Sequence, residues 1–163
     1  MKKFSLKKIN EIMALPLGDL LFESQNVHRK NFPKNDVQLA SLISIKTGSC
    51  PEDCKYCPQS AHYNVDLKKE KLINLMSLEN AAIKAKKNGA QRFCMGAAWK
   101  KLKDGNDLET VIKMVKTVKS LGLEACVTLG TISESQAKKL KEAGLDAYNH
   151  NIDSSPSFYK KII

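Results

Sequence analysis

The stretch Lys87-Asn-Gly-Ala-Gln-Arg-Phe-Cys-Met95 joins the end of an amphipathic helix to a short apolar strand through a glycine. Glycine just past a helix adopts the left-handed cap conformation at no steric cost. The same order recurs twice, with Gly122 before residues 124–129 and Gly144 before residues 146–152. This repeated order of helix, glycine and strand predicts parallel strands with helices packed outside them, as in doubly wound sheets or barrels.

The chain before this repeat predicts two helices and one more strand. Apolar residues at helical spacing indicate a first helix with Ser5 as its N-cap and a second that ends before Pro33. Residues 39–45 are predicted to form a buried strand, and Ser155 followed by Pro156 predicts the start of a last helix. Four strand-helix units do not close an eight-stranded barrel, which typically takes about 250 residues. The sheet is therefore small and open, or it is the first half of something larger.

The composition is that of an ordinary folded chain. Its 163 residues are 42% hydrophobic and carry a formal net charge of +10, yet no apolar run approaches the roughly 20 residues that span a bilayer. The charge is almost all lysine, with Arg29 and Arg92 the only arginines, which favours solvated helix faces over a nucleic-acid surface. The basic start lacks the apolar segment of a secretory signal. We therefore expect a cytoplasmic protein with no nucleic-acid or membrane partner.

The candidate chemistry is concentrated in the loop Gly48-Ser-Cys-Pro-Glu-Asp-Cys-Lys-Tyr-Cys-Pro-Gln-Ser60. Five cysteines without a secretion signal argue for reduced thiols, metal binding or catalysis rather than disulfides. Cys50, Cys54 and Cys57 can converge within this short loop. Because a zinc site usually recruits four ligands, three thiolates suit an iron–sulfur cube with one iron open to another ligand. The alternatives are chance clustering and a zinc site completed by His62.

The other two cysteines are predicted to lie at similar depth on consecutive strands. Cys94 lies five residues after Gly89, and Cys126 four residues after Gly122. Neighbouring strands are roughly 5 Å apart, so two thiols on the inner face at one level can hold a second cluster. The alternative is that both are small buried hydrophobic residues.

A third candidate group lies at the end of the predicted fourth strand. Asn149, Asn151 and Asp153 are spaced by two, which places their side chains on one face of an extended chain. Parallel barrels have their active sites at the carboxyl ends of the strands. The alternative is a turn cluster at the strand end.

Together these motifs resemble a known family. The three-cysteine loop, with an aromatic residue directly before its third cysteine, is similar to the signature of the radical S-adenosylmethionine (SAM) enzymes. With residues 92–99, 122–130 and 148–153, it resembles the biotin synthase family. The resemblance covers essentially the whole chain but only the N-terminal half of a family member. It implies an α/β fold: a helical extension over residues 1–36, then the first four strand-helix units of a (β/α)8 TIM-type barrel, incomplete, over residues 37–163.

The resemblance implies two clusters and SAM as cofactors. A [4Fe–4S] cluster on Cys50, Cys54 and Cys57 would bind SAM, while Cys94 and Cys126 match two ligands of a [2Fe–2S] cluster. The implied enzyme is a sulfurtransferase that converts dethiobiotin to biotin, the last step of biotin biosynthesis, by radical-mediated sulfur insertion. No side chain is expected to act as a conventional acid or base.

The resemblance also assigns contacts outside the clusters. Asn149 would contact dethiobiotin. The partners it implies are an electron-donor protein such as a flavodoxin and, in the full-length family, a second copy in a homodimer. The residues that it places against SAM are Tyr56, Gly96, Ala97, Ala98, Trp99, Asn151 and Asp153.

Because the resemblance ends at half a family member, we expect a truncated biotin synthase. Without later strands the [2Fe–2S] cluster lacks two ligands, and the first and fourth strands have unpaired edges. This chain alone is therefore predicted not to complete biotin formation, although it can hold the [4Fe–4S] cluster. The alternatives are an inactive chain that binds only an iron–sulfur cluster or zinc, and another radical SAM enzyme.

Overall fold

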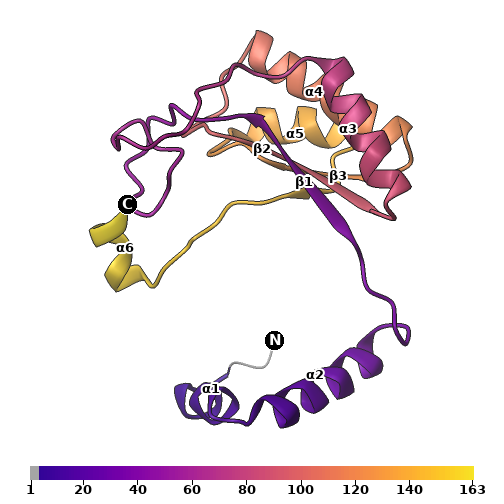
Figure 1. The fold of residues 1–163 in the computed structure, drawn as a ribbon, viewed down its shortest axis with the longest axis vertical. Helices are drawn as coiled ribbons and strands as arrows, with labels where there is room; N and C mark the ends of the chain where they lie inside the picture. Colours follow the sequence, from indigo (N-terminus) through magenta and orange to yellow (C-terminus); the bar gives the residue numbers. More distant parts are fainter. Residues whose placement is uncertain (1–3) are drawn as a thin grey trace. The chain divides into compact units, whose positions relative to one another are not determined.

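The structure is a computed structural model that describes residues 4–163 (Figure 1). The chain divides into two compact units, Met1–Val37 and Gln38–Ile163, the first described from residue 4. Within residues 4–163, no helix has the length and apolar content needed to cross a membrane.

The first unit contains helices α1 (Leu6–Met13) and α2 (Leu17–Asn31). The side chain of Ser5 accepts a hydrogen bond from the backbone N–H of Lys8, which confirms the predicted N-cap. The chain leaves the helix at Phe32, directly before Pro33, as predicted. Neither helix has a buried residue among those described, so both present their apolar side chains to solvent within this unit.

A parallel four-stranded sheet forms the centre of the second unit. Its strands are β1 (Ala40–Lys46), β2 (Arg92–Ala97), β3 (Glu124–Thr128) and β4 (Ala147–Tyr148), and they lie side by side in the order β1-β2-β3-β4. Doubly wound sheets reverse their strand order at a switch point, whereas barrel strands follow one another around the wall. The strand order is therefore that of a barrel wall.

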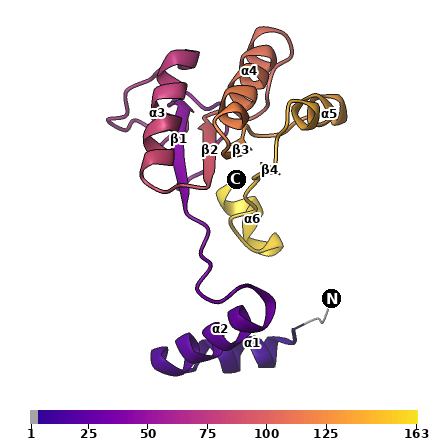
Figure 2. The ribbon, with the colours of Figure 1, turned by 90° about the vertical axis from the view of Figure 1, so that its right-hand side faces the viewer.

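Helices α3 (Leu75–Lys87), α4 (Asn106–Ser120) and α5 (Glu134–Glu142) cover one face of this sheet (Figure 2). The helices before β2 and β3 end as predicted, at Gly89 and Gly122 with φ of +87° and +76°. Covering one face and not both again distinguishes a barrel wall from a doubly wound sheet. The predicted α/β fold, a partial (β/α) barrel after two N-terminal helices, is confirmed.

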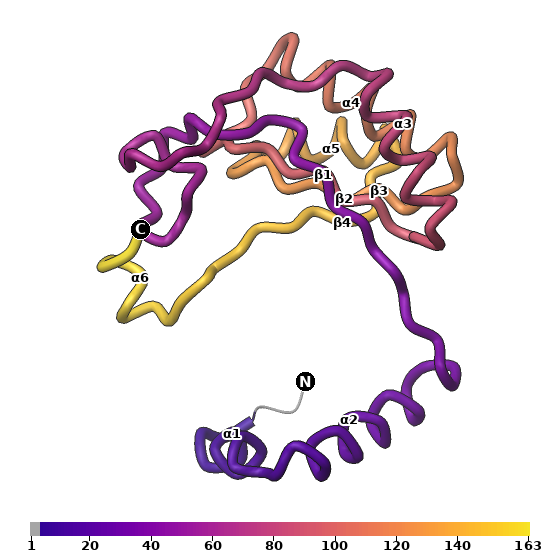
Figure 3. Tube along the Cα trace, viewed as in Figure 1, coloured from indigo at the N-terminus to yellow at the C-terminus, as the bar shows by residue number. Residues whose placement is uncertain are grey.

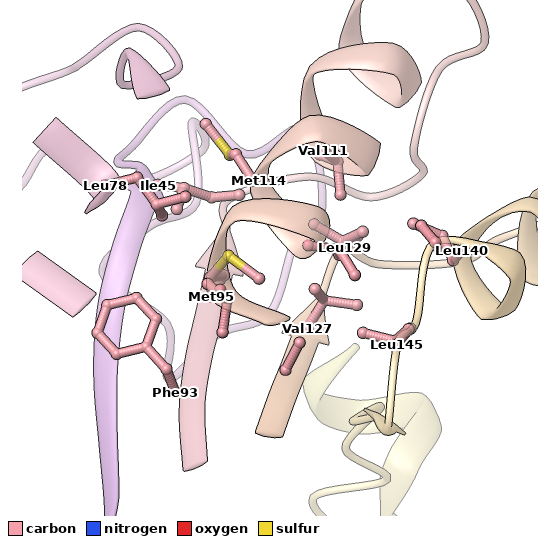
Figure 4. Packing of buried hydrophobic residues seen from close by; sticks show 14 of the residues in the cluster. Ile45, Leu78, Phe93, Met95, Val111, Met114, Val127, Leu129, Leu140 and Leu145 are labelled. Atoms are coloured by element: carbon pink, nitrogen blue, oxygen red, sulfur yellow. The ribbon is translucent and has the colours of Figure 1, made fainter. Parts of the chain in front are cut away.

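The hydrophobic core lies between the sheet and these helices (Figure 4). Phe93 and Met95 of β2 and Val127 of β3 are at most 1% exposed, as is Leu129 beyond β3, so the predicted alternation of faces is confirmed. On the opposite face of the sheet, Leu42 is 72% exposed. That open face corresponds to the inside of a barrel.

The fourth strand is much shorter than the predicted run of residues 146–152. β4 pairs only with β3, and β3 ends at Thr128, so β3 offers few partners beyond Tyr148. The last contact of this ladder is the N–H of Asn149 donating to Val127 O at 2.9 Å. The chain then continues to α6 (Pro156–Ile162), which begins at the predicted proline. Its end lies beside the loop after β1 (Figure 3), where Lys55 N donates to Ile162 O at 2.9 Å.

Candidate metal centre and cofactor pocket

The loop of residues 48–60, here called the cysteine loop, follows β1 and is closed by backbone hydrogen bonds. Cys50 N donates to Gln59 O at 2.9 Å, and Ala61 N donates to Cys50 O at 2.7 Å. Between them, Cys57 N donates to Cys54 O at 2.9 Å. All three cysteines of the loop are free and partly exposed. Main-chain pairing thus brings three accessible thiols into one closed turn.

The thiols of this loop lie within each other's electrostatic reach. Burial is the main cause that raises the pKa of Cys54, and negative charge on Cys57, Glu52 and Cys50 raises it further. Thiolates, not thiols, bind metals, so a metal must displace the thiol proton. Three soft sulfur donors suit an iron–sulfur cluster, which is held by cysteine thiolates.

A site for one metal ion is not formed by the described residues. Across residues 4–163, no group of three or more His, Cys, Asp or Glu side chains is placed to hold a single ion. His62, the predicted fourth ligand of the zinc alternative, has Nε2 3.3 Å from the carbonyl oxygen of Pro51. The same finding covers the three thiols of the cysteine loop, so neither they nor His62 form a single-ion site among residues 4–163.

A cavity of about 270 Å³ opens beside Cys50 and Cys57. Its wall includes Gly96, Ala97, Ala98 and Trp99, the four residues predicted to support SAM. Ala98 N donates to Lys46 O at 2.9 Å, which attaches that segment to the end of β1. The structure thus brings the predicted SAM segment and two cysteines to one cavity at the carboxyl ends of the strands.

The three polar residues after β4 fall into two groups. Asn149 Nδ2 donates to Asn151 Oδ1 at 3.1 Å and lies 3.5 Å from Thr128 Oγ1, so the two asparagines lie together. Asp153 instead accepts a hydrogen bond of 2.5 Å from the hydroxyl of Tyr56. This bond is the main cause that raises the pKa of Tyr56. Asp153 therefore contacts the cysteine loop rather than the asparagines.

Cys94 and Cys126 are register partners on β2 and β3, as predicted from their distances to the preceding glycines. Burial, followed by the neighbouring Cys94 thiol, raises the pKa of Cys126 to about 11, while Arg92 acts in the opposite direction. Cys126 is 7% exposed and Cys94 is partly exposed. The two thiols thus form a pair on the inner face, and their role as cluster ligands stays a prediction.

Two side chains that sequence analysis did not single out hold the cysteine loop in place. Gln59 Oε1 accepts a hydrogen bond from Gly48 N at 2.6 Å. Lys46 Nζ donates to Gly48 O at 2.5 Å and to Ala98 O at 3.2 Å. Both side chains bond to backbone groups, so residue spacing does not predict their roles. The only available signal is that Gln59 follows the third cysteine by two residues.

A three-thiol loop after the first strand of a barrel wall, beside a cavity, defines the class of this protein. The family described as the Radical SAM superfamily matches residues 44–163. The chain therefore belongs to the radical SAM superfamily, whose members use a [4Fe–4S] cluster and SAM.

Within this superfamily, the chain is similar to biotin synthases. It is 55% identical over 160 residues to the biotin synthase of Idiomarina loihiensis, covering 98% of this chain and 46% of that protein. The biotin synthase of Myxococcus xanthus is 56% identical with the same coverage. That of Cupriavidus metallidurans is 59% identical over 152 residues, covering 93% of this chain and 44% of that protein. The chain spans about half the length of the curated relatives it matches.

Proposed function

We propose that this chain carries the radical-generating half of a biotin synthase, the enzyme that converts dethiobiotin to biotin. Cys50, Cys54 and Cys57 hold a [4Fe–4S] cluster, and SAM occupies the adjoining cavity. The observation that carries the proposal is the cavity itself, which borders two of these cysteines and residues 96–99. The similarity to biotin synthases over 98% of the chain supports the substrate.

The protein's own contribution is ligation, orientation and exclusion of water. When bound, the cluster and SAM supply the one-electron chemistry that amino-acid side chains lack. Cys50, Cys54 and Cys57 would hold the cluster through their thiolates and would leave it open to SAM. Residues 96–99 line the cavity and would support the methionine part of SAM.

The polar residues after β4 supply the hydrogen bonds of the site. Asn151 and Asp153 bind the ribose hydroxyls of SAM, and Tyr56 lies against its adenine. Asn149, whose side chain donates a hydrogen bond to Asn151, would contact dethiobiotin through its side-chain amide. The hydrogen bond between Asn149 and Asn151 would thus fix dethiobiotin and SAM in position relative to each other.

We further propose that Cys94 and Cys126 are two ligands of a [2Fe–2S] cluster that supplies sulfur. Their shared level on the inner face supports this role. The remaining ligands then come from residues other than these 163.

The partners proposed are an electron-donor protein of the flavodoxin kind and a second copy in a homodimer. A hollow of about 650 Å³ beside Pro51 is lined by Lys46, Lys100, Lys101 and Lys103, together with Asp104 and Asp107. A predominantly basic rim next to the cysteine loop supports an acidic electron donor. Cysteine ligands for iron further support a reducing, cytoplasmic setting.

The first test is anaerobic reconstitution of the chain with iron and sulfide. Iron content and electron paramagnetic resonance (EPR) spectra are recorded with and without SAM. We expect about four irons per chain and a spectrum that SAM perturbs. Cys54→Ala is expected to lose the iron, and the matched control Cys94→Ala to keep it. Equal iron in both variants, or a spectrum that SAM leaves unchanged, would contradict the proposal.

The substrate is tested separately by equilibrium dialysis of dethiobiotin against the reconstituted, SAM-loaded chain. We expect saturable binding of dethiobiotin that Asn149→Ala weakens. An unrelated short-chain fatty acid should not compete with dethiobiotin for the site. A chain that binds iron and SAM but takes up no dethiobiotin would instead be another radical SAM enzyme.

A further inference from the structure

The placement of Cys50 depends on Gln59, which holds the start of the cysteine loop with both its main chain and its side chain. The carbonyl oxygen of Gln59 accepts from Cys50 N at 2.9 Å. Its side-chain Oε1 accepts from Gly48 N at 2.6 Å. One residue thus fixes two backbone N–H groups on either side of Ser49.

Gly48 needs these partners because of its own conformation. It is buried, and its φ of +71° is one that glycine adopts without strain. A buried backbone N–H without an acceptor costs free energy comparable to a lost hydrogen bond. Gln59 satisfies the N–H, and Lys46 Nζ, 2.5 Å from Gly48 O, satisfies the carbonyl.

The orientation of the Gln59 amide follows from the same bond. Because a backbone N–H only donates, the atom facing Gly48 is the oxygen Oε1 and not the amide nitrogen. Gln59 also lines the cavity beside Cys50 and Cys57. Gln59 therefore belongs to the wall of the proposed cofactor pocket and also contacts the turn that carries the first cysteine.

We propose that Gln59 is a positioning residue that sets Cys50 for the [4Fe–4S] cluster through the hydrogen bond of its side chain to Gly48. This inference rests on the proposed function. Without the bond, Gly48 is no longer held to Gln59, and Cys50 keeps only its backbone hydrogen bonds to Gln59 and Ala61. The first thiol is then less firmly fixed relative to Cys54 and Cys57. The predicted consequence is poorer assembly of the cluster and an altered response to SAM.

The test compares two variants of Gln59 with a matched control. Gln59→Leu removes the acceptor, while Gln59→Glu keeps an oxygen at the same position. Gln91→Leu is the control, because Gln91 Oε1 also accepts from a backbone N–H, that of Leu39 at 3.3 Å, before the start of β1. Circular dichroism checks that each variant is folded.

The first readout needs no iron. Hydrogen exchange of the Gly48 amide in the iron-free chain is expected to be about tenfold faster in Gln59→Leu, as expected for one lost hydrogen bond. Exchange should return toward that of the parent chain in Gln59→Glu and stay unchanged in Gln91→Leu. Equal Gly48 protection in Gln59→Leu and the parent would overturn the inference.

The second readout is the cluster. After anaerobic reconstitution, Gln59→Leu is expected to hold at most about half the iron of the parent or to lose the EPR change on adding SAM, since one of three protein ligands is misplaced. Gln59→Glu should recover most of this loss. Full iron and an unchanged SAM response in Gln59→Leu would overturn the inference. If the parent chain itself takes up no iron, the proposed function falls, while the exchange data still decide whether Gln59 holds Gly48.

Discussion

The hydroxyl of Tyr56, in the cysteine loop, donates a 2.5 Å hydrogen bond to the carboxylate of Asp153, beyond β4. Asp153 has φ of +61°, a conformation that non-glycine residues adopt uncommonly. The neighbouring contact from Lys55 N to Ile162 O, 2.9 Å, holds the same two segments together. Two residues that the resemblance assigns to SAM are therefore bonded to each other in this structure.

We predict that Tyr56→Phe tightens SAM binding by about threefold to tenfold. The ribose of SAM and the Tyr56 hydroxyl would compete for one carboxylate, and an exposed hydrogen bond of this kind stabilises by about 1 kcal/mol. Asp153→Asn should weaken SAM binding instead. The measurement is a titration of the EPR change with SAM on the reconstituted chain.

The matched control is Tyr63→Phe. The Tyr63 hydroxyl also donates to a carboxylate, that of Asp53 at 2.7 Å, but the resemblance assigns neither residue to SAM. We expect SAM affinity within about twofold of the parent for this variant. Weaker SAM binding by Tyr56→Phe would mean that the hydroxyl assists the nucleotide, contrary to the prediction.

Gly130→Ala is predicted to be clearly more destabilising than Gly105→Ala. Both glycines have positive φ, +74° and +79°. A Cβ at Gly130 would overlap the carbonyl oxygens of Trp99 and Lys100, while a Cβ at Gly105 meets nothing within 4 Å. Gly105 has ψ of −134°, so Gly105→Ala should cost backbone strain of about 1–3 kcal/mol, and Gly130→Ala clearly more because of the added overlap. Urea denaturation followed by circular dichroism measures both, and equal midpoints would contradict this reading of the Gly130 contact.

Much of this fold follows from local patterns in the sequence. The period of two in the strands placed Phe93 and Met95 toward the helices, and both are buried. The glycines at the ends of α3 and α4 mark where the chain turns back to the sheet. The number of residues between each glycine and the next cysteine therefore predicts that Cys94 and Cys126 lie at the same height in neighbouring strands. These features depend on near neighbours, which is why residue spacing predicts them.

Other features depend on distant partners. β4 is short because its partner β3 ends at Thr128. The apolar run of residues 146–152 gives no information about the end of β3. The spacing of Asn149, Asn151 and Asp153 predicted one cluster, but Asp153 pairs with a residue 97 positions away. Gln59 bonds to a backbone group, so no sequence motif reveals its role. Residue spacing thus predicts the cysteine loop but not the side-chain bonds that hold it in place.

The one-sided cover of the sheet leads to a prediction about two leucines. Leu129 lies on the helix-covered face and is fully buried, while Leu42 lies on the open face and is 72% exposed. Leu129→Ala should cost about 2–5 kcal/mol because it leaves a cavity, and Leu42→Ala less than about 0.5 kcal/mol. Denaturant midpoints of both variants check this. A comparable loss for Leu42→Ala would mean that the open face is covered in solution.

The stability of the chain is predicted to fall at acid pH partly through Asp146. Burial alone would raise the pKa of this carboxyl, but hydrogen bonds from Lys119 Nζ and from Ala125 N, both 2.8 Å, lower it overall. A carboxyl with a depressed pKa in the folded state stabilises the fold above its unfolded pKa of about 3.9, and this contribution is lost as the pH falls through the folded value. Asp146 therefore stabilises fully at neutral pH, and its contribution declines as the pH falls below about 4.

Asp146→Asn isolates this effect, since asparagine keeps an oxygen for Ala125 N but carries no charge. We expect the variant to be less stable than the parent by about 0.5–1 kcal/mol at pH 7, because the ion pair is partly exposed, and the difference to shrink as the pH falls below about 4. Urea denaturation at several pH values measures it. In a Lys119→Met background the same substitution should cost less at pH 7, because the cation is already gone. A difference that stays constant from pH 7 to pH 3 would show that the Asp146 charge does not stabilise the fold.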